Sequence, residues 1–156
     1  MSVLSSETIH ASAVEIGGAA VLIAGPSGSG KSDLALRLID RGAILVSDDQ
    51  TMLVRRGAEL VASAPTAIRG KFEIRGLGVI DCPFAGESPV RLIVRLTELY
   101  ERFPMDQQSE TIAGIEVTRI QLNAYEASAP VKVEWALRAV LDRKPATAPR
   151  RPSASL

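Results

Sequence analysis

Residues 25–32 read Gly25-Pro-Ser-Gly-Ser-Gly30-Lys31-Ser32, which fits the phosphate-loop pattern G-x-x-x-x-G-K-[ST]. An unbroken apolar run, Ala19–Ala24, precedes the loop, and an amphipathic stretch, Ser32–Arg41, follows it. The run predicts a strand buried on both faces. The stretch predicts a helix whose inner side carries Leu34 and Leu38. This strand–loop–helix unit predicts an α/β fold that holds the phosphates of a nucleotide.

Each residue type in the loop has a physical task. Glycine lets the backbone amide groups approach phosphate oxygens, and the start of the following helix carries partial positive charge. Lys31 puts a compact cation between the β- and γ-phosphates, and Ser32 offers a hydroxyl to Mg²⁺. The residues expected to bind the nucleotide are Gly25, Pro26, Ser27, Gly28, Ser29, Gly30, Lys31 and Ser32.

Two adjacent carboxylates follow the next predicted strand. Residues 43–47 predict a second buried strand, and Asp48 and Asp49 come directly after it. Because the carboxyl ends of neighbouring parallel strands share one edge of a sheet, we expect both carboxylates to face the γ-phosphate. One can hold Mg²⁺ and the other can accept a proton from an attacking hydroxyl, and the sequence leaves open which does which. The alternative is that the pair only caps a turn.

Other elements are expected around this unit. They are a strand over Thr8–Ile16, a hairpin of residues 51–55 and 59–63, a strand over Val90–Thr97, a hairpin over Ile112–Leu122, and a helix over Pro130–Leu141. Trp135, the only tryptophan, is expected in the core or in an interface. From Arg143 onward the chain is rich in proline and small residues, which predicts a disordered basic tail over 143–156 and a folded domain over 1–142.

Composition excludes several classes of protein. The 156 residues fit one domain, and 18 Lys plus Arg balance 18 Asp plus Glu, so a bulk nucleic-acid binder is not expected. Cys82 is the only cysteine, which excludes a disulfide framework and a thiolate zinc site. No apolar run approaches the roughly 20 residues of a membrane helix, and Met1–Glu7 does not read as a secretory signal. We therefore expect a cytoplasmic protein without a membrane span.

A glycine-rich basic cluster lies further along the chain, at residues 68–80. Its cations and glycines can clamp phosphate, and Glu73 can reach a metal ion. Its second half reads Glu73-Ile-Arg-Gly-Leu-Gly-Val-Ile80. Together with the phosphate loop and Val46-Ser-Asp-Asp49, this segment resembles the catalytic domain of the HPr kinase/phosphorylase family. The resemblance spans roughly residues 10–102.

This resemblance implies a P-loop-containing mixed α/β sheet with flanking helices, of the HPr kinase / PEP carboxykinase-like kind. It implies a protein-serine kinase that uses ATP and Mg²⁺ and phosphorylates HPr, the phosphocarrier protein of the phosphotransferase system. It further implies homo-oligomers, typically hexamers. The longer family members carry an additional N-terminal domain, and this chain is expected to be the short, catalytic-domain form.

The resemblance also implies roles for single residues. His10 lies ahead of the loop at the spacing of the family's active-site histidine, although Ala11 follows it where the family has glycine. Arg102 ends Leu99-Tyr-Glu-Arg102, which is similar to a family stretch with a catalytic arginine. The residues expected to be catalytic are His10, Lys31, Asp48, Asp49 and Arg102, and those expected to hold the metal are Ser32 and Glu73.

The chain departs from the family pattern near its end. Family members with phosphorylase activity carry a Pro-x-x-Pro-Gly-Arg-Asn type segment after the last strands. Here residues 120–130 read Ile-Gln-Leu-Asn-Ala-Tyr-Glu-Ala-Ser-Ala-Pro, without arginine or glycine. The departure argues against the reverse, dephosphorylating activity.

Two other functions use the same loop. A small-molecule kinase would need a metabolite pocket and usually an arginine-rich lid, and no lid insertion is evident between the predicted elements. A nucleotide-responsive binding module would bind ATP without transferring phosphate. The acidic pair argues against the binding module, because binding an anion does not call for two carboxylates beside it.

Overall fold

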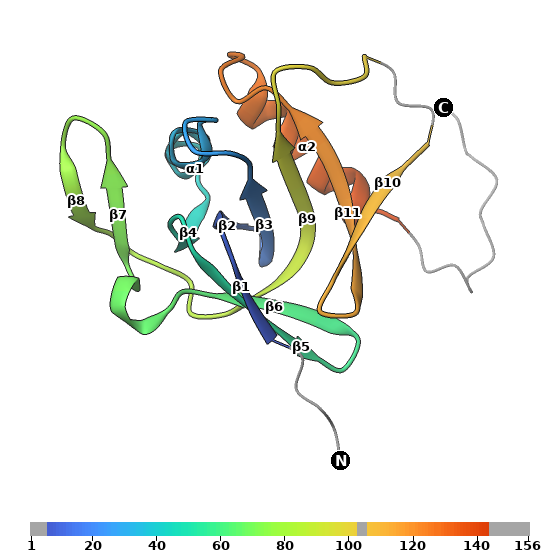
Figure 1. Cartoon of the computed structure of the whole chain (residues 1–156), viewed down its shortest axis with the longest axis horizontal. Coiled ribbons are helices and arrows are strands. Elements are labelled where there is room, and N and C mark those ends of the chain that lie inside the picture. Colours follow the sequence, from blue (N-terminus) through green and yellow to red (C-terminus); the bar gives the residue numbers. More distant parts are fainter. Residues whose placement is uncertain (1–5, 103–105, 144–156) are drawn as a thin grey trace.

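The computed structural model describes residues 6–102 and 106–143, which form two α-helices, one short 3-10 helix and eleven strands (Figure 1). The strands are β1 (Ser6–Ile9), β2 (Ala11–Ile16), β3 (Ala19–Ala24), β4 (Ile44–Ser47), β5 (Thr51–Arg56), β6 (Glu59–Ser63), β7 (Lys71–Ile74), β8 (Gly78–Asp81), β9 (Ser88–Leu96), β10 (Gln108–Ile112) and β11 (Ile115–Leu122). The helices are α1 (Lys31–Asp40), η1 (Thr66–Ile68) and α2 (Ala129–Leu141). Apart from Arg143, the expected tail lies outside the described residues.

A nine-stranded mixed sheet forms the framework of the fold, in the order β1-β5-β6-β9-β3-β2-β4, with β11 between β9 and β10. Strands β3, β9 and β11 run parallel to one another. Strand β2 runs antiparallel to both β3 and β4, so β4 points the same way as β3. The carboxyl ends of β3, β4, β9 and β11 therefore lie at one edge of the sheet. The expected mixed α/β sheet is confirmed.

Two details of the expected sheet are wrong. The predicted strand over Thr8–Ile16 is broken at His10, because β1 leaves to pair with β5 while β2 pairs with β3 and β4. The hydroxyl of Thr51 donates to the carbonyl oxygen of Ala11 (2.8 Å) beside this break. The strands β3 and β4 are also not neighbours, since β2 lies between them. Their carboxyl ends still share an edge because both pair antiparallel with β2.

Strand β3 is buried on both faces, as its apolar run predicts. Val21 and Ile23 belong to a core under α1 and α2, whereas Ala20 and Leu22 belong to a core with β5, β6 and β10. The two helices cover the first face, and the curled β5–β6 hairpin covers the second (Figure 1). The phosphate loop thus leaves the most deeply packed strand, which gives the loop a rigid base.

Leu22→Ala tests this central position of β3. Leu22 is fully buried, so its truncation leaves a cavity between the sheet and the β5–β6 hairpin. We expect the free energy of unfolding to fall by about 2–5 kcal/mol, measured by urea denaturation. Leu99, which is 87% exposed, provides the control, since Leu99→Ala removes the same atoms without leaving a cavity. Equal stability of the two variants would contradict this packing.

The helices lie within one residue of their expected bounds. Helix α1 ends before Gly42, whose backbone adopts φ +113° and whose N–H donates to the carbonyl of Ile39 (3.0 Å). Helix α2 has Pro130 in its first turn. Of the two places expected for Trp135, the core is wrong, because this side chain is 64% exposed on the outer side of α2, with the Arg138 guanidinium 5.1 Å from its ring centroid. Its place in an interface stays a prediction.

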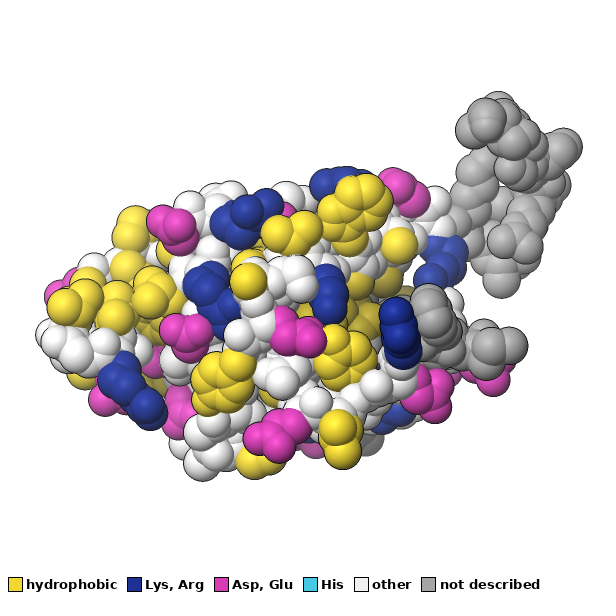
Figure 2. Space-filling model, turned by 90° about the horizontal axis from the view of Figure 1, so that it is seen from above, with side chains coloured by type: hydrophobic (Ala, Val, Ile, Leu, Met, Phe, Trp, Pro, Cys, Tyr) yellow, Lys and Arg dark blue, Asp and Glu magenta, His cyan; other side chains and the backbone are white. Residues whose placement is uncertain are grey.

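The hairpin of β7 and β8, which was not among the expected elements, forms its own two-stranded sheet beside the main one (Figure 1). It carries the exposed hydrophobic side chains of Leu77, Val79 and Ile80. Hydrophobic side chains gather at this end of the molecule, on the left of Figure 2. Within the described ranges, neither helix is long and apolar enough to span a membrane.

Candidate active site

Four segments with functional side chains follow strands that point the same way. The phosphate loop follows β3, and Asp48 and Asp49 follow β4. Residues 97–102 follow β9, and residues 123–128 follow β11. Ligands of open α/β sheets bind outside this edge. The strand order puts the acid pair on one side of the loop and the other two segments on the opposite side.

The phosphate loop has the conformation that its glycines predict. Gly30 adopts φ +96° at the start of α1, and a Cβ added there would lie 2.9 Å from Cβ of Ala124. The side chain of Lys31 is buried, and its ammonium donates to the carbonyl oxygens of Gly25 (2.9 Å) and Pro26 (3.2 Å). A cation, the loop amides and the helix N-terminus therefore converge on one small volume, which suits a polyphosphate.

Asp48 is held by three hydrogen bonds from three different elements. Its Oδ1 accepts from the hydroxyls of Ser32 in α1 (2.7 Å) and Ser12 in β2 (3.2 Å). Its Oδ2 accepts from the backbone N–H of Glu73 in β7 (3.0 Å). These contacts bring the phosphate loop, the acid pair and the β7–β8 hairpin together.

Asp49 lies beside Asp48 but has different surroundings. Its backbone is in the left-handed region, with φ +70°, which few residue types other than glycine, asparagine and aspartate adopt. Its N–H donates to the hydroxyl of Ser12 (3.0 Å), and its Oδ1 lies 2.6 Å from Nε2 of His10. The Asp49 side chain is 60% exposed. The break in the first strand therefore aims His10 at the acid pair.

Arg102 lies in the segment that follows β9. In this segment the hydroxyl of Tyr100 donates to Oε1 of Glu126 (2.6 Å), and the ammonium of Lys132 lies 3.2 Å from both of these oxygens. The Tyr100 and Lys132 donors lower the pKa of the Glu126 carboxyl. These contacts tie the segment of Arg102 to the loop between β11 and α2, on the side of the phosphate loop away from the acid pair.

Sequence reasoning missed three residues that hold the site together. Ser12 contacts both members of the acid pair. The Arg37 guanidinium donates to the carbonyls of Ala124 and Glu126, and the Tyr125 hydroxyl donates to the carbonyl of Gly28. The partners lie between 36 and 97 residues apart in the sequence, so no local pattern could have indicated these contacts.

A cavity of about 520 Å³ opens beside the loop. Its lining includes His10, Gly25 and Pro26 from the site and the ion pair of Arg95 and Glu110 from β9 and β10. The guanidinium donates to both carboxylate oxygens of Glu110 (2.6 and 2.7 Å). This pairing lowers the pKa of Glu110 and raises that of Arg95, so both groups stay charged. The cavity is therefore adjacent to the site, on the side where His10 lies.

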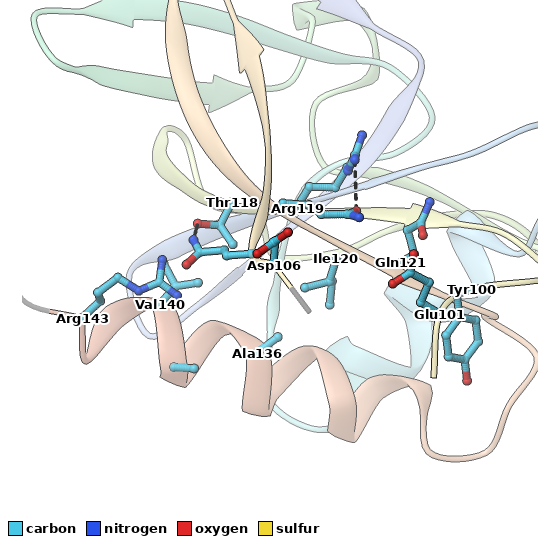
Figure 3. Close-up of a pocket in the computed structure, with 13 residues that line it drawn as sticks. Tyr100, Glu101, Asp106, Thr118, Arg119, Ile120, Gln121, Ala136, Val140 and Arg143 are labelled. Carbon is cyan, nitrogen blue, oxygen red and sulfur yellow. Dashed lines mark hydrogen bonds between the residues drawn. The ribbon is translucent and has the colours of Figure 1, made fainter. Parts of the chain in front are cut away.

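A second cavity, of about 250 Å³, lies between β11, α2 and the segment after β9 (Figure 3). The side chain of Ile120 faces it from β11, and Ala136 and Val140 face it from α2, whereas the Arg119 side chain points away from α2. Arg119 donates to Oε1 of Gln108 (3.0 Å) at its rim. None of its lining residues belongs to the phosphate loop or the acid pair, so we do not assign it to the active site.

The site offers oxygen ligands to a metal ion. In the part of the chain that the structure describes, no three His, Cys, Asp or Glu side chains group closely enough to hold a metal by themselves. A hydroxyl and a carboxylate 2.7 Å apart, at Ser32 and Asp48, fit Mg²⁺, which prefers oxygen and keeps several waters or phosphate oxygens. Glu73 lies next to them through its backbone contact.

Comparisons with known proteins agree on one family. The family model described as the HPr Serine kinase C-terminal domain matches residues 2–142. A protein named HPr kinase/phosphorylase from Chlorobium phaeobacteroides is 38% identical over an alignment 126 residues long, and the match covers 72% of this chain and 37% of that protein. One from Burkholderia lata is 35% identical over an alignment 144 residues long, and the match covers 84% of this chain and 45% of that protein. The chain thus spans less than half the length of these relatives.

A solved structure has the same fold. The structure titled "Hpr(Ser) kinase/phosphatase from Coxiella burnetii" aligns with a TM-score of 0.74 and 32% sequence identity. The alignment covers 85% of this chain and 95% of that one. The likeness therefore extends over most of the chain.

Proposed function

The chain belongs to the HPr serine kinase C-terminal domain family, and from that premise we propose that it is a cytoplasmic, ATP- and Mg²⁺-dependent protein-serine kinase acting on an HPr-type phosphocarrier protein. The observation that carries the proposal is the contact between Ser32 of the phosphate loop and Asp48 of the acid pair, 2.7 Å long. It supports a site in which Asp48 and its neighbour Asp49 lie beside the position expected for a terminal phosphate, an arrangement that suits transfer more than binding alone.

The loop residues bind and orient the triphosphate. The loop amides and the N-terminus of α1 hold the phosphate oxygens. The Lys31 ammonium lies against the loop carbonyls, from where it can stabilise the negative charge of the transferring phosphoryl group. Ser32, Asp48 and Glu73 would hold Mg²⁺, which supplies positive charge to the β- and γ-phosphates. Transfer then depends mainly on positioning and electrostatics.

We assign the role of proton acceptor to Asp49. Asp48 already accepts three hydrogen bonds, which suits it to the metal side of the site. Asp49 is more exposed, and its carboxylate is oriented by His10. The serine hydroxyl of the partner gives its proton to Asp49 as its oxygen bonds to the γ-phosphorus. The bond from that phosphorus to the bridging oxygen breaks, and ADP leaves with its electron pair.

We propose that the partner protein binds at the cavity lined by His10 and Pro26. His10 connects this cavity to Asp49, so a serine that enters there approaches the proton acceptor. The ion pair of Arg95 and Glu110 gives its wall a fixed pattern of charge, with Glu110 only 17% exposed. We infer that this pair contacts the segment of HPr next to the serine.

Arg95→Ala tests the partner cavity. We expect the KM for HPr to rise about tenfold while the affinity for ATP stays the same, because the pair touches the partner and not the nucleotide. Arg56→Ala is the matched control, since Arg56 also donates two hydrogen bonds to one carboxylate, that of Glu87 (2.7 and 2.6 Å), away from the site. An unchanged KM in Arg95→Ala would place the partner elsewhere.

Association of the chain with itself forms part of the proposal. The exposed side chains of Leu77, Val79 and Ile80 and the exposed ring of Trp135 are apolar surfaces of the kind that bury well between subunits. Because the resemblance to the family implies hexamers, we expect a homo-oligomer. Sedimentation velocity measures it directly, and a monomer at micromolar concentration would contradict it.

The decisive assay incubates the protein with Mg-ATP and HPr and maps phosphate by mass spectrometry. We expect one phosphoserine on HPr and none on a panel of hydroxyl metabolites. Because residues 120–130 lack the arginine of the family pattern, we expect no release of phosphate from phospho-HPr in the reverse assay with inorganic phosphate. Binding of ATP without transfer to any acceptor would identify a nucleotide-responsive module instead.

A further inference from the structure

We propose that Tyr125 is the nucleobase platform of this site and that its hydroxyl also braces the phosphate loop. The inference rests on the proposed function in one respect, namely that the ligand of the loop is a nucleoside triphosphate. Tyr125 lies in the segment where the chain departs from its family's pattern, so no role carries over to it from the resemblance.

The strand order fixes the direction in which a nucleotide runs through the site. In the order β11-β9-β3-β2-β4, the acid pair follows β4 and Tyr125 follows β11, on opposite sides of the loop after β3. Asp48 contacts Ser32, so the terminal phosphate and its metal belong on the β4 side. The other end of the ligand, the base, then lies toward Tyr125.

The contacts of Tyr125 bring its ring onto the loop. Its hydroxyl donates to the carbonyl of Gly28, and a Cβ added at Gly30 would lie 3.5 Å from its Cζ and 3.6 Å from its Cε1. The side chain is nevertheless 65% exposed, so much of the ring remains open to a ligand. An aromatic ring fixed at one edge and open on a face is the surface on which a flat base stacks.

The segment that carries Tyr125 is held in place before any ligand arrives. The side-chain oxygen of Asn123 accepts from the N–H of Tyr125 (2.9 Å). Arg37 of α1 binds the carbonyls on either side of Tyr125, at Ala124 and Glu126, and also pairs with Asp33 (3.0 Å). The ring therefore loses little conformational freedom when a base stacks on it, and this strengthens binding.

Isothermal titration with two probes separates the two parts of the proposal. ATP has a base and inorganic tripolyphosphate has none. The affinity for ATP divided by the affinity for tripolyphosphate therefore measures how much the nucleoside contributes to binding. Tyr125→Ala is expected to lower this ratio by about 5- to 100-fold. Tyr125→Phe keeps the ring and loses only the hydroxyl, so it is expected to weaken both probes equally, by about 2- to 10-fold, with the ratio unchanged.

Trp135→Ala is the matched control, because it removes an equally exposed aromatic ring from α2 that stacks on Arg138 and not on the loop. Both affinities should match those of the parent protein when the two are compared in the same oligomeric state. A ratio that is the same in Tyr125→Ala as in the parent would overturn the base platform. An unchanged affinity for tripolyphosphate in Tyr125→Phe would overturn the brace.

A fluorescent variant gives a second reading that does not depend on Tyr125→Ala folding well. Tyr125→Trp combined with Trp135→Phe leaves one tryptophan, at the proposed platform. ATP should quench its emission and tripolyphosphate should not, whereas equal responses would count against stacking. No HPr is present in these assays. A parent protein that binds ATP in this way but fails to phosphorylate HPr would refute the proposed function and leave the platform standing.

Discussion

Lys31→Ala is expected to reduce the turnover of phosphoryl transfer by about three orders of magnitude or more. The Lys31 ammonium lies against the loop carbonyls of Gly25 and Pro26, and in the proposed mechanism it faces the phosphates, where negative charge accumulates during transfer. Alanine removes this charge from a site that solvent cannot easily enter to replace it. Initial rates with labelled ATP and HPr measure the loss.

Arg91→Ala controls for the change in net charge. Arg91 pairs with Glu59 on the exposed side of β9 and touches neither the loop nor the acid pair. Its removal should leave the turnover unchanged. If Lys31→Ala also kept the parent turnover, the phosphate loop would not be the place where transfer occurs, and the mechanism would fail.

Asp49→Asn is expected to lower the turnover by about 10²- to 10⁴-fold while leaving the affinity for Mg-ATP nearly intact. An amide cannot take the proton of the serine hydroxyl, but asparagine tolerates the left-handed backbone that Asp49 adopts at φ +70°. A lower turnover would therefore result from the loss of the proton acceptor and not from a distorted turn. Single-turnover rates and equilibrium binding of ATP, measured on the same preparation, separate the two effects.

Asp48→Asn provides the contrast within the pair. Asp48 contacts Ser32 and the backbone of Glu73, so its substitution should weaken the binding of ATP in the presence of Mg²⁺ and have less effect in its absence. If the two substitutions had exchanged outcomes, with Asp48 required only for turnover and Asp49 only for binding, the assignment of the proton acceptor would be reversed.

The parts of the fold that depend on neighbouring residues could be predicted. The apolar run of β3, the glycines of the loop and the amphipathic pattern of α1 each specify their own conformation. The hairpins β5–β6 and β10–β11 also follow from short turns flanked by strand formers. The same local logic put Asp48 and Asp49 at the carboxyl end of a buried strand.

The pairing of distant strands could not be predicted. Local pattern does not show that the chain breaks at His10, nor that β2 inserts between β3 and β4, because both depend on contacts formed only in the folded sheet. The hydroxyl contact of Tyr125 with Gly28 spans 97 residues and leaves no trace in either segment alone. Ser12 reads in the sequence as one small residue in an alanine-rich strand.

The most direct test of the account is a crystal structure of the protein with Mg²⁺ and a non-hydrolysable ATP analogue. The account predicts the triphosphate in the loop of residues 25–32, with a carboxylate oxygen of Asp49 within about 4 Å of the γ-phosphate and Asp48 on the metal side. A γ-phosphate separated from both carboxylates by two layers of water would contradict it, because neither acid could then take part in transfer.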